Sequence, residues 1–481
     1  MTGQDILKPD LCVIGAGAGG LSTAAGAAQM GANVVLIEGA EMGGDCLNVG
    51  CVPSKSILAA GHAAFNARKN ATKFGIDIPT VNTDMQKVHD HIRDVIATIA
   101  PHDSVERFEG LGVHVIKGYA AFTSPKEIEV NDQKILAKKF VIATGSVPFV
   151  PPISGLQDVP YLTNETIFNL TTLPDHLIII GGGPIGCEMA QAFCHLGTKV
   201  TLISLSTIMQ HDDEDIVDIA RKRLVNDGID LYEETDIKHV VKNRSNIQID
   251  IETKNNAKHT ITGSHLLVAT GRKPNIDRLN LNAANVNYDD YGIPVDAGMR
   301  TNNKRVFAIG DCTKTYQFTH IAGYQAGIVL QRALFKLPIK ANYAALPHVT
   351  YTDPEVATVG MNETAAKRQL KTGSYQVLTW PYKDNDRAQT ERSTEGFIKA
   401  IVKPNGRILG MTAVGKGAGE LIPLWSLAIS KKMKIKDIAQ LIIPYPTYSE
   451  VSKRVAGSYF TQKIFSPRMK KIVRFIQFFT R

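Results

Sequence analysis

The chain has 481 residues, of which 44% are hydrophobic and 21% are charged. This composition is typical of a globular protein of roughly three domains, and it excludes a disordered or fibrous chain. The six cysteines are too few for a disulfide scaffold, no apolar run predicts a membrane span, and residues 1–9 hold no signal-peptide core. We therefore expect a cytoplasmic protein.

The formal net charge of +8 is confined to the C-terminal end of the chain. No Asp or Glu follows Glu450, so residues 1–450 are formally neutral. The body of the protein therefore gives no indication of nucleic-acid binding. The excess positive charge comes from Lys453, Arg454, Lys463, Arg468, Lys470, Lys471, Arg474 and Arg481.

A glycine-rich motif near the N-terminus predicts a dinucleotide-binding site. It follows an apolar strand expected over residues 10–15, and an Ala-rich helix and a second strand over residues 33–37 come after it. The first glycine permits a tight turn, the second lets the backbone approach a pyrophosphate, and the third lets helix and strand pack closely. Glu38, at the end of the second strand, is placed to accept hydrogen bonds from ribose hydroxyls. The glycines are Gly15, Gly17 and Gly20.

The same glycine spacing recurs after an apolar strand over residues 178–180. A helix through residues 191–196 and a strand over residues 199–203 complete this second unit, so two dinucleotides are expected. Ser204 stands where the first unit has its ribose-binding acid, and no Arg lies between it and Asp212, so NADH and NADPH both remain candidates. The second set of glycines is Gly181, Gly183 and Gly186.

Two further repeated segments indicate the domain organisation. Residues 141–145 and 267–271 both predict an apolar strand that ends in Ala-Thr-Gly. One Rossmann-like unit inserted in another is the simplest arrangement, so we expect an α/β fold with two such domains and a C-terminal α+β unit with strands near 356–359 and 397–402. The expected boundaries are 1–150 and 272–345 for the first unit, 151–271 for the inserted unit, 346–466 for the third unit and 467–481 for a terminal helix.

Two cysteines five residues apart, Cys46 and Cys51, lie beyond the first glycine motif in a Gly-rich stretch that ends at Lys55. A zinc site needs two more ligands, which the neighbouring sequence lacks, and a structural disulfide is unexpected in a cytosolic protein. Two inert buried thiols remain an alternative. A helix N-terminus beside a cation lowers the pKa of a thiol, so the pattern favours a redox-active pair.

This cysteine stretch resembles the signature of the class I pyridine nucleotide–disulfide oxidoreductases, the family of dihydrolipoamide dehydrogenase, glutathione reductase and mercuric reductase. The resemblance includes both glycine motifs, the turn over residues 270–275 and the segment 308–311. It implies an FAD-dependent homodimer that also binds NAD or NADP in its inserted unit, with Glu38 on the adenosine ribose and Asp311 on the ribityl chain. The candidate cofactor-binding residues are Gly15, Gly17, Gly20, Glu38, Gly44, Thr144, Gly145, Gly181, Gly183, Gly186, Ser204, Gly271, Arg272, Gly310 and Asp311.

The resemblance also implies catalytic roles. Electrons would pass from the nicotinamide through the flavin to a Cys46–Cys51 disulfide, with Cys51 nearer the flavin and Cys46 meeting the substrate. Lys55 and Glu188 would pair beside the flavin ring, where a cation favours the reduced flavin. The alternative for Glu188 is an ordinary exposed acid on a helix.

One position departs from the dehydrogenase pattern. Those relatives carry a His–Glu acid–base pair that the partner subunit supplies; Glu450 matches the Glu, but Tyr445 stands where the His would be. A phenol, with a pKa of about 10, is a poor base at neutral pH, and mercuric reductases resemble this chain in having Tyr there. The alternative is a packing aromatic without a chemical role. The C-terminal cysteine pair of mercuric reductases is missing, since no Cys follows Cys312.

These features predict a mercuric-reductase-like NAD(P)H oxidoreductase that reduces a small disulfide or a soft metal ion through Cys46 and Cys51, without a resident metal site. One alternative is dihydrolipoamide dehydrogenase activity. Another is a membrane-recruited NAD(P)H dehydrogenase that donates electrons to a quinone or a membrane partner.

The C-terminal tail predicts a basic amphipathic helix that begins at Pro467. Lys470, Lys471, Arg474 and Arg481 lie opposite its apolar residues. Such a helix lies flat on an anionic membrane, which would place the protein at the inner face of that membrane; the alternative is a helix packed on its own dimer. The apolar residues are Met469, Ile472, Val473, Ile476 and Phe479.

Overall fold

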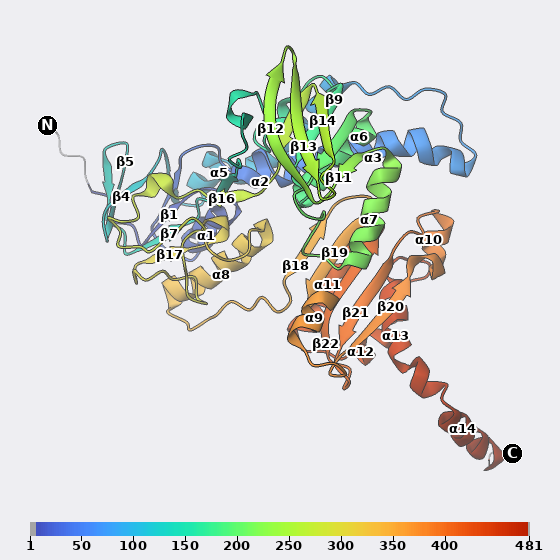
Figure 1. Ribbon diagram of the computed structural model, residues 1–481. Coiled ribbons are helices and arrows are strands. Elements are labelled where there is room, and N and C mark those ends of the chain that lie inside the picture. The colour runs from blue at the N-terminus through green and yellow to red at the C-terminus, as the bar shows by residue number, and fades with distance from the viewer. Residues whose placement is uncertain (1–5, 480–481) are drawn as a thin grey trace.

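The computed structural model describes residues 6–479, an α/β fold with two parallel sheets and a C-terminal antiparallel sheet (Figure 1). The first parallel sheet has five strands in the order β17-β7-β1-β2-β3. Its central strand is buried along its whole length, which explains its uninterrupted apolar sequence. Helices α1 (Ala18–Gln29) and α8 (Thr319–Phe335) pack against each other beside this sheet. The strands are β1 (Leu11–Ile14), β2 (Val34–Glu38), β3 (Val113–Lys117), β7 (Lys139–Ile142) and β17 (Val306–Ala308).

The second parallel sheet repeats this arrangement, as the second glycine motif predicts. It has four strands in the order β11-β10-β9-β15. The helix expected through residues 191–196 already begins at Pro184, because the fixed φ of proline suits the first turn of a helix. The elements are β9 (His176–Ile180), α6 (Pro184–Leu196), β10 (Lys199–Ile203), α7 (Glu214–Asp227), β11 (Asp230–Tyr232) and β15 (His265–Val268).

Antiparallel strands connect and flank the parallel sheets. β8 (Ser146–Pro148) pairs with β16 (Arg272–Pro274), so the chain leaves the first sheet and returns to it along two adjacent strands. A three-stranded sheet, β12–β14, stands at the top of Figure 1. The remaining strands of this half are β4 (Ala121–Ser124), β5 (Glu127–Val130), β6 (Gln133–Ile135), β12 (Thr235–Asn243), β13 (Asn246–Thr253) and β14 (Lys258–Gly263).

The C-terminal unit is built on a five-stranded antiparallel sheet with the order β18-β19-β22-β21-β20. It contains both strands expected there, since β19 (Glu355–Gly360) covers residues 356–359 and β21 is Phe397–Val402. The other elements are β18 (Pro347–Thr350), α9 (Glu363–Gln369), β20 (Gln376–Pro381), α10 (Asp386–Thr390), β22 (Ile408–Gly415), α11 (Ala418–Ser430), α12 (Ile435–Ala439) and α13 (Glu450–Ile464).

The predicted terminal helix is present as α14 (Pro467–Phe479) and begins at the expected proline. It points away from the rest of the molecule (Figure 1). The last two residues of this predicted segment, 480 and 481, and the first five of the chain lie outside the described residues. No helix within residues 6–479 combines the length and the apolar character that a bilayer span requires.

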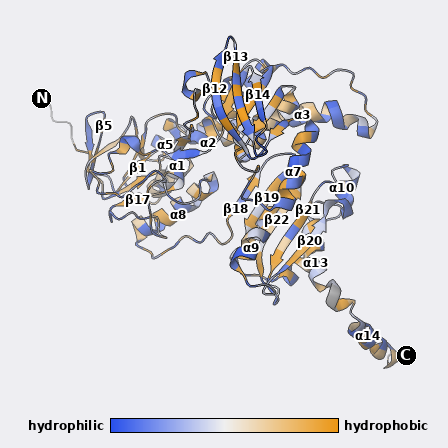
Figure 2. Cartoon of the chain, in the orientation of Figure 1, coloured by the Kyte–Doolittle hydropathy of each residue, from blue (hydrophilic) through white to orange (hydrophobic). Residues whose placement is uncertain are grey.

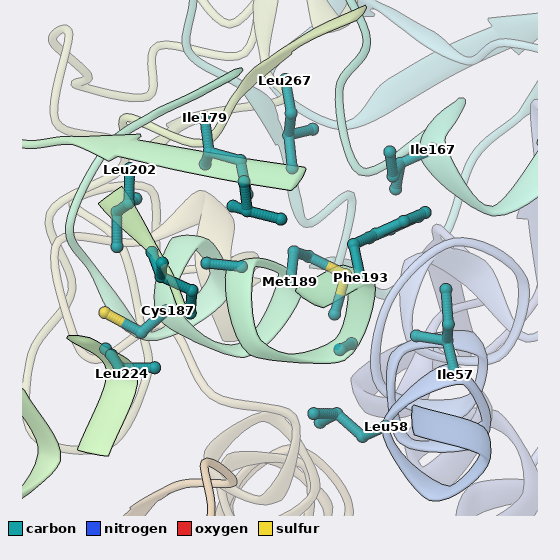
Figure 3. Close-up of a cluster of buried hydrophobic side chains, with 14 of the residues drawn as sticks. Ile57, Leu58, Ile167, Ile179, Cys187, Met189, Phe193, Leu202, Leu224 and Leu267 are labelled. Atoms are coloured by element: carbon teal, nitrogen blue, oxygen red, sulfur yellow. The ribbon is translucent and has the colours of Figure 1, made fainter. Parts of the chain in front are cut away.

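A hydrophobic cluster fixes the helix that begins at Cys51 against the inserted unit. α3 (Cys51–Phe65) packs along α6, and Figure 3 shows Ile57 of α3 facing Met189 and Phe193 of α6. Cys187, also on α6, is a buried member of this cluster, where it packs as a small hydrophobic residue. The remaining helices of the first unit are α2 (Gly44–Asn48), α4 (Met85–Ile99) and α5 (Val105–Gly110).

A buried ion cluster joins the inserted unit to the C-terminal unit. The Lys399 ammonium of β21, whose side chain is 3% exposed, lies 3.3 Å from Asp213, 2.7 Å from Asp215 and 2.7 Å from Glu363. Burial opposes ionisation of Asp213, yet hydrogen bonds from Thr364 and the charge of Lys399 hold its pKa below the ordinary value. Burial likewise opposes the charge of Lys399, but Asp215 and Glu363 keep its pKa raised. The cluster is therefore ionised at neutral pH.

Candidate active site

A cleft of about 450 Å³ opens where β1, β2 and β7 end. Ligands of open α/β sheets bind at this edge, and the volume is within the range of roughly 300–1,000 Å³ found for ligand pockets. The cleft brings together most of the residues predicted to bind the first dinucleotide. Those that line it are Gly15, Gly17, Glu38, Gly44, Thr144, Gly145, Arg272, Gly310 and Asp311, together with Cys46.

The glycines of the first motif are required by the geometry of the turn. Gly15 has a φ of +104°, which favours glycine, and a Cβ on Gly20 would lie 1.8 Å from the Gly15 carbonyl oxygen. Only glycine therefore lets α1 begin so close to β1. The N-terminus of α1, which holds no acidic residue in its first turn, opens on the cleft and presents free amides to an anion. This cradle fits the pyrophosphate of a dinucleotide.

Two of the predicted carboxylates line the cleft, Glu38 and Asp311. Glu38 accepts hydrogen bonds from the amides of Ala16 and Ala40, which hold its carboxylate beside the glycine turn. Asp311 accepts a hydrogen bond from the Ser146 hydroxyl at 2.7 Å. Burial raises the pKa of Asp311, while Ser146 and Arg272 act in the opposite direction. Both carboxylates can accept hydrogen bonds from ligand hydroxyls, as the predicted contacts to the ribose and the ribityl chain require.

Arg272 links the cleft to the cysteine stretch. Its guanidinium lies 2.7 Å from the carboxylate of Asp45 and donates to the Ser146 hydroxyl at 2.7 Å. Asp45 directly precedes Cys46, so this ion pair ties the start of β16 to α2. Arg272 therefore holds the wall of the cleft in place, and its position agrees with the prediction that it lies at a cofactor site.

Cys46 lies within α2 and Cys51 is the first residue of α3, and both residues are free thiols. A hydrogen bond from the Cys46 thiol, the Thr319 hydroxyl 3.3 Å from Cys51 Sγ, and the charge of Lys55 together lower the pKa of Cys51 to about 6. The same hydrogen bond to Cys51 raises the pKa of Cys46. At neutral pH the pair therefore consists of a thiolate at Cys51 and a protonated thiol at Cys46.

Lys55 and Glu188 form the predicted ion pair, with Lys55 Nζ 2.6 Å from Glu188 Oε2. Glu188 is only 5% exposed, which excludes the alternative of an exposed helix acid. Tyr351, between β18 and β19, completes the arrangement. Its ring centroid lies 4.3 Å from Lys55 Nζ, and its backbone amide donates to Glu188 Oε1 at 3.0 Å. The ammonium of Lys55 is thus held between a buried carboxylate and an aromatic face.

The second glycine turn repeats the geometry of the first. Gly181 has a φ of +119°, and a Cβ on Gly186 would lie 1.8 Å from the Gly181 carbonyl oxygen. Ser204 is buried at the end of β10, where a Cβ on Gly182 would approach its hydroxyl to 2.4 Å. Gly271 follows β15 with a φ of +142°. The turn fits a second dinucleotide, and at the ribose position the strand end offers a hydroxyl in place of a carboxylate.

Tyr445 and Glu450 do not line the cleft of their own chain. Tyr445 is 70% exposed, so it is not a packing aromatic within its own chain, and its hydroxyl donates to Asp386 at 3.0 Å. That hydrogen bond and the charge of Asp386 raise the pKa of Tyr445. Glu450 is the first residue of α13. The phenol therefore keeps its proton at neutral pH and can donate it but not accept one.

Three contributors to the site escaped the sequence analysis. Tyr351 lies 163 residues from Glu188, and Thr319 lies 268 residues from Cys51, so no local pattern connects them. The position of Asp45 beside Cys46 could have indicated a nearby cation, because an acid next to a thiol raises the pKa of that thiol unless a cation offsets the negative charge. That cation is Arg272.

Comparison with known proteins gives these features a context. The family model described as pyridine nucleotide-disulphide oxidoreductase matches residues 9–326, and the dimerisation domain of the same family matches residues 346–456. A mercuric reductase from Lysinibacillus sphaericus is 34% identical over 453 residues, which are 94% of this chain and 82% of that protein. A dihydrolipoyl dehydrogenase from Staphylococcus aureus is 32% identical over 465 residues, 95% of this chain and 97% of that protein.

The fold is also similar to that of a solved structure. The Cu(II) complex of the HOCl-induced flavoprotein disulfide reductase RclA from Escherichia coli superposes with a TM-score of 0.84. The two sequences are 25% identical, and the match covers 94% of this chain and 100% of the other. The likeness therefore includes both dinucleotide-binding units and the C-terminal unit.

Proposed function

Because the chain belongs to the pyridine nucleotide-disulphide oxidoreductase family, whose members use FAD and NAD(P)H, we propose that it reduces a soft metal ion or a small disulfide through Cys46 and Cys51. The chain is an FAD-dependent oxidoreductase, and the proposal concerns its acceptor and the roles of its residues. When bound, FAD supplies the transfer of an electron pair from the nicotinamide to the cysteine pair. The observation that carries the proposal is the geometry of the pair: Cys46 lines the cleft, and the Thr319 hydroxyl lies 3.3 Å from Cys51 Sγ.

The two cysteines divide the chemistry between them. The reduced pair, a thiolate at Cys51 and a thiol at Cys46, loses two electrons and one proton as it forms a disulfide. A disulfide acceptor gains both electrons, that proton and a second proton from solvent, whereas metal ions gain the electrons and the proton passes to solvent. Thr319 and Lys55 stabilise the Cys51 thiolate, so that Cys46 is left as the thiol that meets the acceptor.

Lys55 and Glu188 prepare the first cofactor site for negative charge. The ammonium is positioned by a 2.6 Å ion pair with Glu188 and by the face of Tyr351. A fixed cation stabilises developing negative charge without reorganisation, which is the usual electrostatic contribution of a preorganised site. In the inserted unit, the turn at Gly181 is the proposed site of the nicotinamide nucleotide.

The character of Tyr445 favours a reductive reaction over dihydrolipoamide oxidation. Dihydrolipoamide oxidation needs a base to remove a thiol proton, and a phenol with a raised pKa is protonated at neutral pH. A soft metal ion displaces the thiol proton itself when it binds sulfur, so it needs no base. We propose that the partner subunit supplies Tyr445 and Glu450 to this site, since the matching dimerisation domain supports a homodimer.

An acceptor panel tests the proposal. NADH and NADPH are each oxidised in the presence of Hg(II), Cu(II), oxidised lipoamide, glutathione disulfide or a quinone, and dihydrolipoamide oxidation is measured in parallel. We expect metal-dependent turnover that Cys46→Ser and Cys51→Ser abolish. We also expect Tyr445→His to raise dihydrolipoamide oxidation by at least about tenfold, because imidazole restores a base, while Tyr445→Phe does not. Ordinary dihydrolipoamide turnover in the unmodified protein, or metal reduction that survives Cys51→Ser, would refute the proposal.

A further inference from the structure

We propose that α14 attaches the protein to the surface of an anionic lipid bilayer. Every side chain from Pro467 to Phe479 is exposed, although this segment is rich in large apolar residues. Large apolar side chains gathered on one exposed segment mark an interaction site. The exposed set, which includes the end of α13, is Ile464, Phe465, Met469, Ile472, Val473, Phe475, Ile476, Phe478 and Phe479.

Most apolar side chains of α14 lie on one side of the helix and its basic side chains on the other, whereas Phe475 lies between the two sides and Phe478 on the basic side. At 100° per residue, the five apolar residues predicted from the sequence fall within an arc of about 120°. Lys470, Lys471 and Arg474 fall in an arc of about 100° centred on the other side. Figure 2 shows both hydrophobic and hydrophilic residues along this helix. Arg468 lies at the edge of the apolar arc, from which a long side chain can reach the lipid headgroups.

The charge of the tail indicates what covers it. No acidic residue follows Glu450, and Lys453 and Arg454 extend the basic stretch into α13. Residues 1–450 are formally neutral, so they carry no net charge that would attract the tail, and the tails of two subunits repel each other. A bilayer with anionic headgroups supplies both a hydrocarbon surface for the apolar side and a negative potential for the basic side.

The position of α14 suits attachment of the whole molecule. α13 packs on β20 and β21, so the base of the tail is anchored in the C-terminal unit, while α14 extends away from that unit (Figure 1). A helix of this length spans about 20 Å, which is too short to cross a bilayer and long enough to lie on one. A homodimer carries two such helices, and simultaneous binding of both strengthens a weak single contact.

Vesicle sedimentation of the full-length holoenzyme tests this inference. The vesicles consist of phosphatidylcholine alone or with about a third of phosphatidylglycerol, at low and high salt. We expect binding to the anionic vesicles at least about tenfold tighter than to the neutral ones, weakened by salt, and lost on deletion of residues 467–481. NAD(P)H oxidation with a soluble acceptor should remain within about twofold in the deletion variant, because the tail does not line the cleft.

Point variants distinguish the contributions of the apolar and the basic side of α14 to vesicle binding. Ile472→Gln with Val473→Gln removes apolar area, and Lys470→Gln with Lys471→Gln removes charge; glutamine preserves the helix in both cases. Each pair should weaken vesicle binding by about tenfold or more, whereas Lys87→Gln, on exposed α4, should leave it unchanged. Equal binding with and without the tail would overturn the inference. So would loss of the dimer on tail deletion without any vesicle binding, which would mean that α14 packs on the partner subunit.

Discussion

Replacement of Cys46 by alanine tests what makes Cys51 acidic. The hydrogen bond from Cys46 is the largest of the effects that lower the pKa of Cys51 to about 6, ahead of Thr319 and Lys55. At pH 7 a thiol with that pKa is about 90% ionised, whereas an ordinary cysteine is about 3% ionised. Because Cys51 is partly exposed to screening solvent, we expect Cys46→Ala to lower its ionised fraction at pH 7 at least about threefold, and Lys55→Met to lower it less.

The assay is the pH profile of alkylation by iodoacetamide, measured on the reduced protein. In the Cys46→Ala variant the profile reports Cys51, because Cys12, Cys187 and Cys312 are buried and the pKa of Cys194 is raised to about 11. The midpoint of the profile must be measured, since a less acidic thiolate is also a stronger nucleophile and the rate at one pH partly hides the change.

Cys46→Ser is the matched control, because its hydroxyl can still donate a hydrogen bond to Cys51. Its midpoint should fall between those of the unmodified protein and Cys46→Ala. The reasoning is refuted if Cys46→Ala leaves the midpoint in place while Lys55→Met moves it to that of an ordinary thiol. In that case the cation, and not the neighbouring thiol, would govern the acidity of Cys51.

Four further substitutions have expected outcomes. Gly20→Ala should abolish FAD retention, whereas Gly186→Ala should keep FAD but lose reduction by NAD(P)H, because each Cβ would collide with a carbonyl of its own turn; flavin absorbance and stopped-flow reduction distinguish them. Glu188→Gln should slow flavin reduction by about tenfold at unchanged flavin content, since Lys55 loses its counter-charge. Lys399→Met should lower the free energy of unfolding in urea by about 3–5 kcal/mol at pH 7, because three carboxylates lose their cation. This last deficit should shrink as the pH falls, since carboxylates with depressed pKa values contribute stability that acid removes from the unmodified protein.

The elements that could be predicted from the sequence are those whose formation depends on residues close together in the chain. Residues 199–203 and 397–402 were predicted as strands and have these bounds in β10 and β21, because continuous apolar runs between turns leave few alternatives. The turn at Gly15 could also be predicted, because the spacing of its glycines follows from the close approach of α1 to β1. The start of α14 was also predicted, because proline suits the first turn of a helix.

The long-range contacts of the site could not be predicted in the same way. Only the family resemblance predicted that Lys55 and Glu188 form an ion pair. No sequence pattern indicated that the ring of Tyr351 lies against the ammonium of Lys55. Packing of α3 on α6 decides which side chains meet, and that packing depends on the shapes of buried residues far apart in the chain. That Ser204 contacts the nucleotide stays a prediction, and NADH and NADPH both remain candidates because a hydroxyl can serve either nucleotide.

The contacts that hold the Lys55 ammonium limit how the protein can be cut into functional fragments. The carboxylate comes from the inserted unit and the aromatic cover from the segment that leads into the C-terminal sheet, so three separate stretches of chain meet at one nitrogen atom. A fragment that ends before residue 346 would keep the cleft but lose the tyrosine and the amide that orients the glutamate. Limited proteolysis or domain exchange should therefore yield pieces that fold and bind nucleotides yet hold this cation loosely. The electrostatic environment of the site belongs to the assembled chain and to no single unit of it.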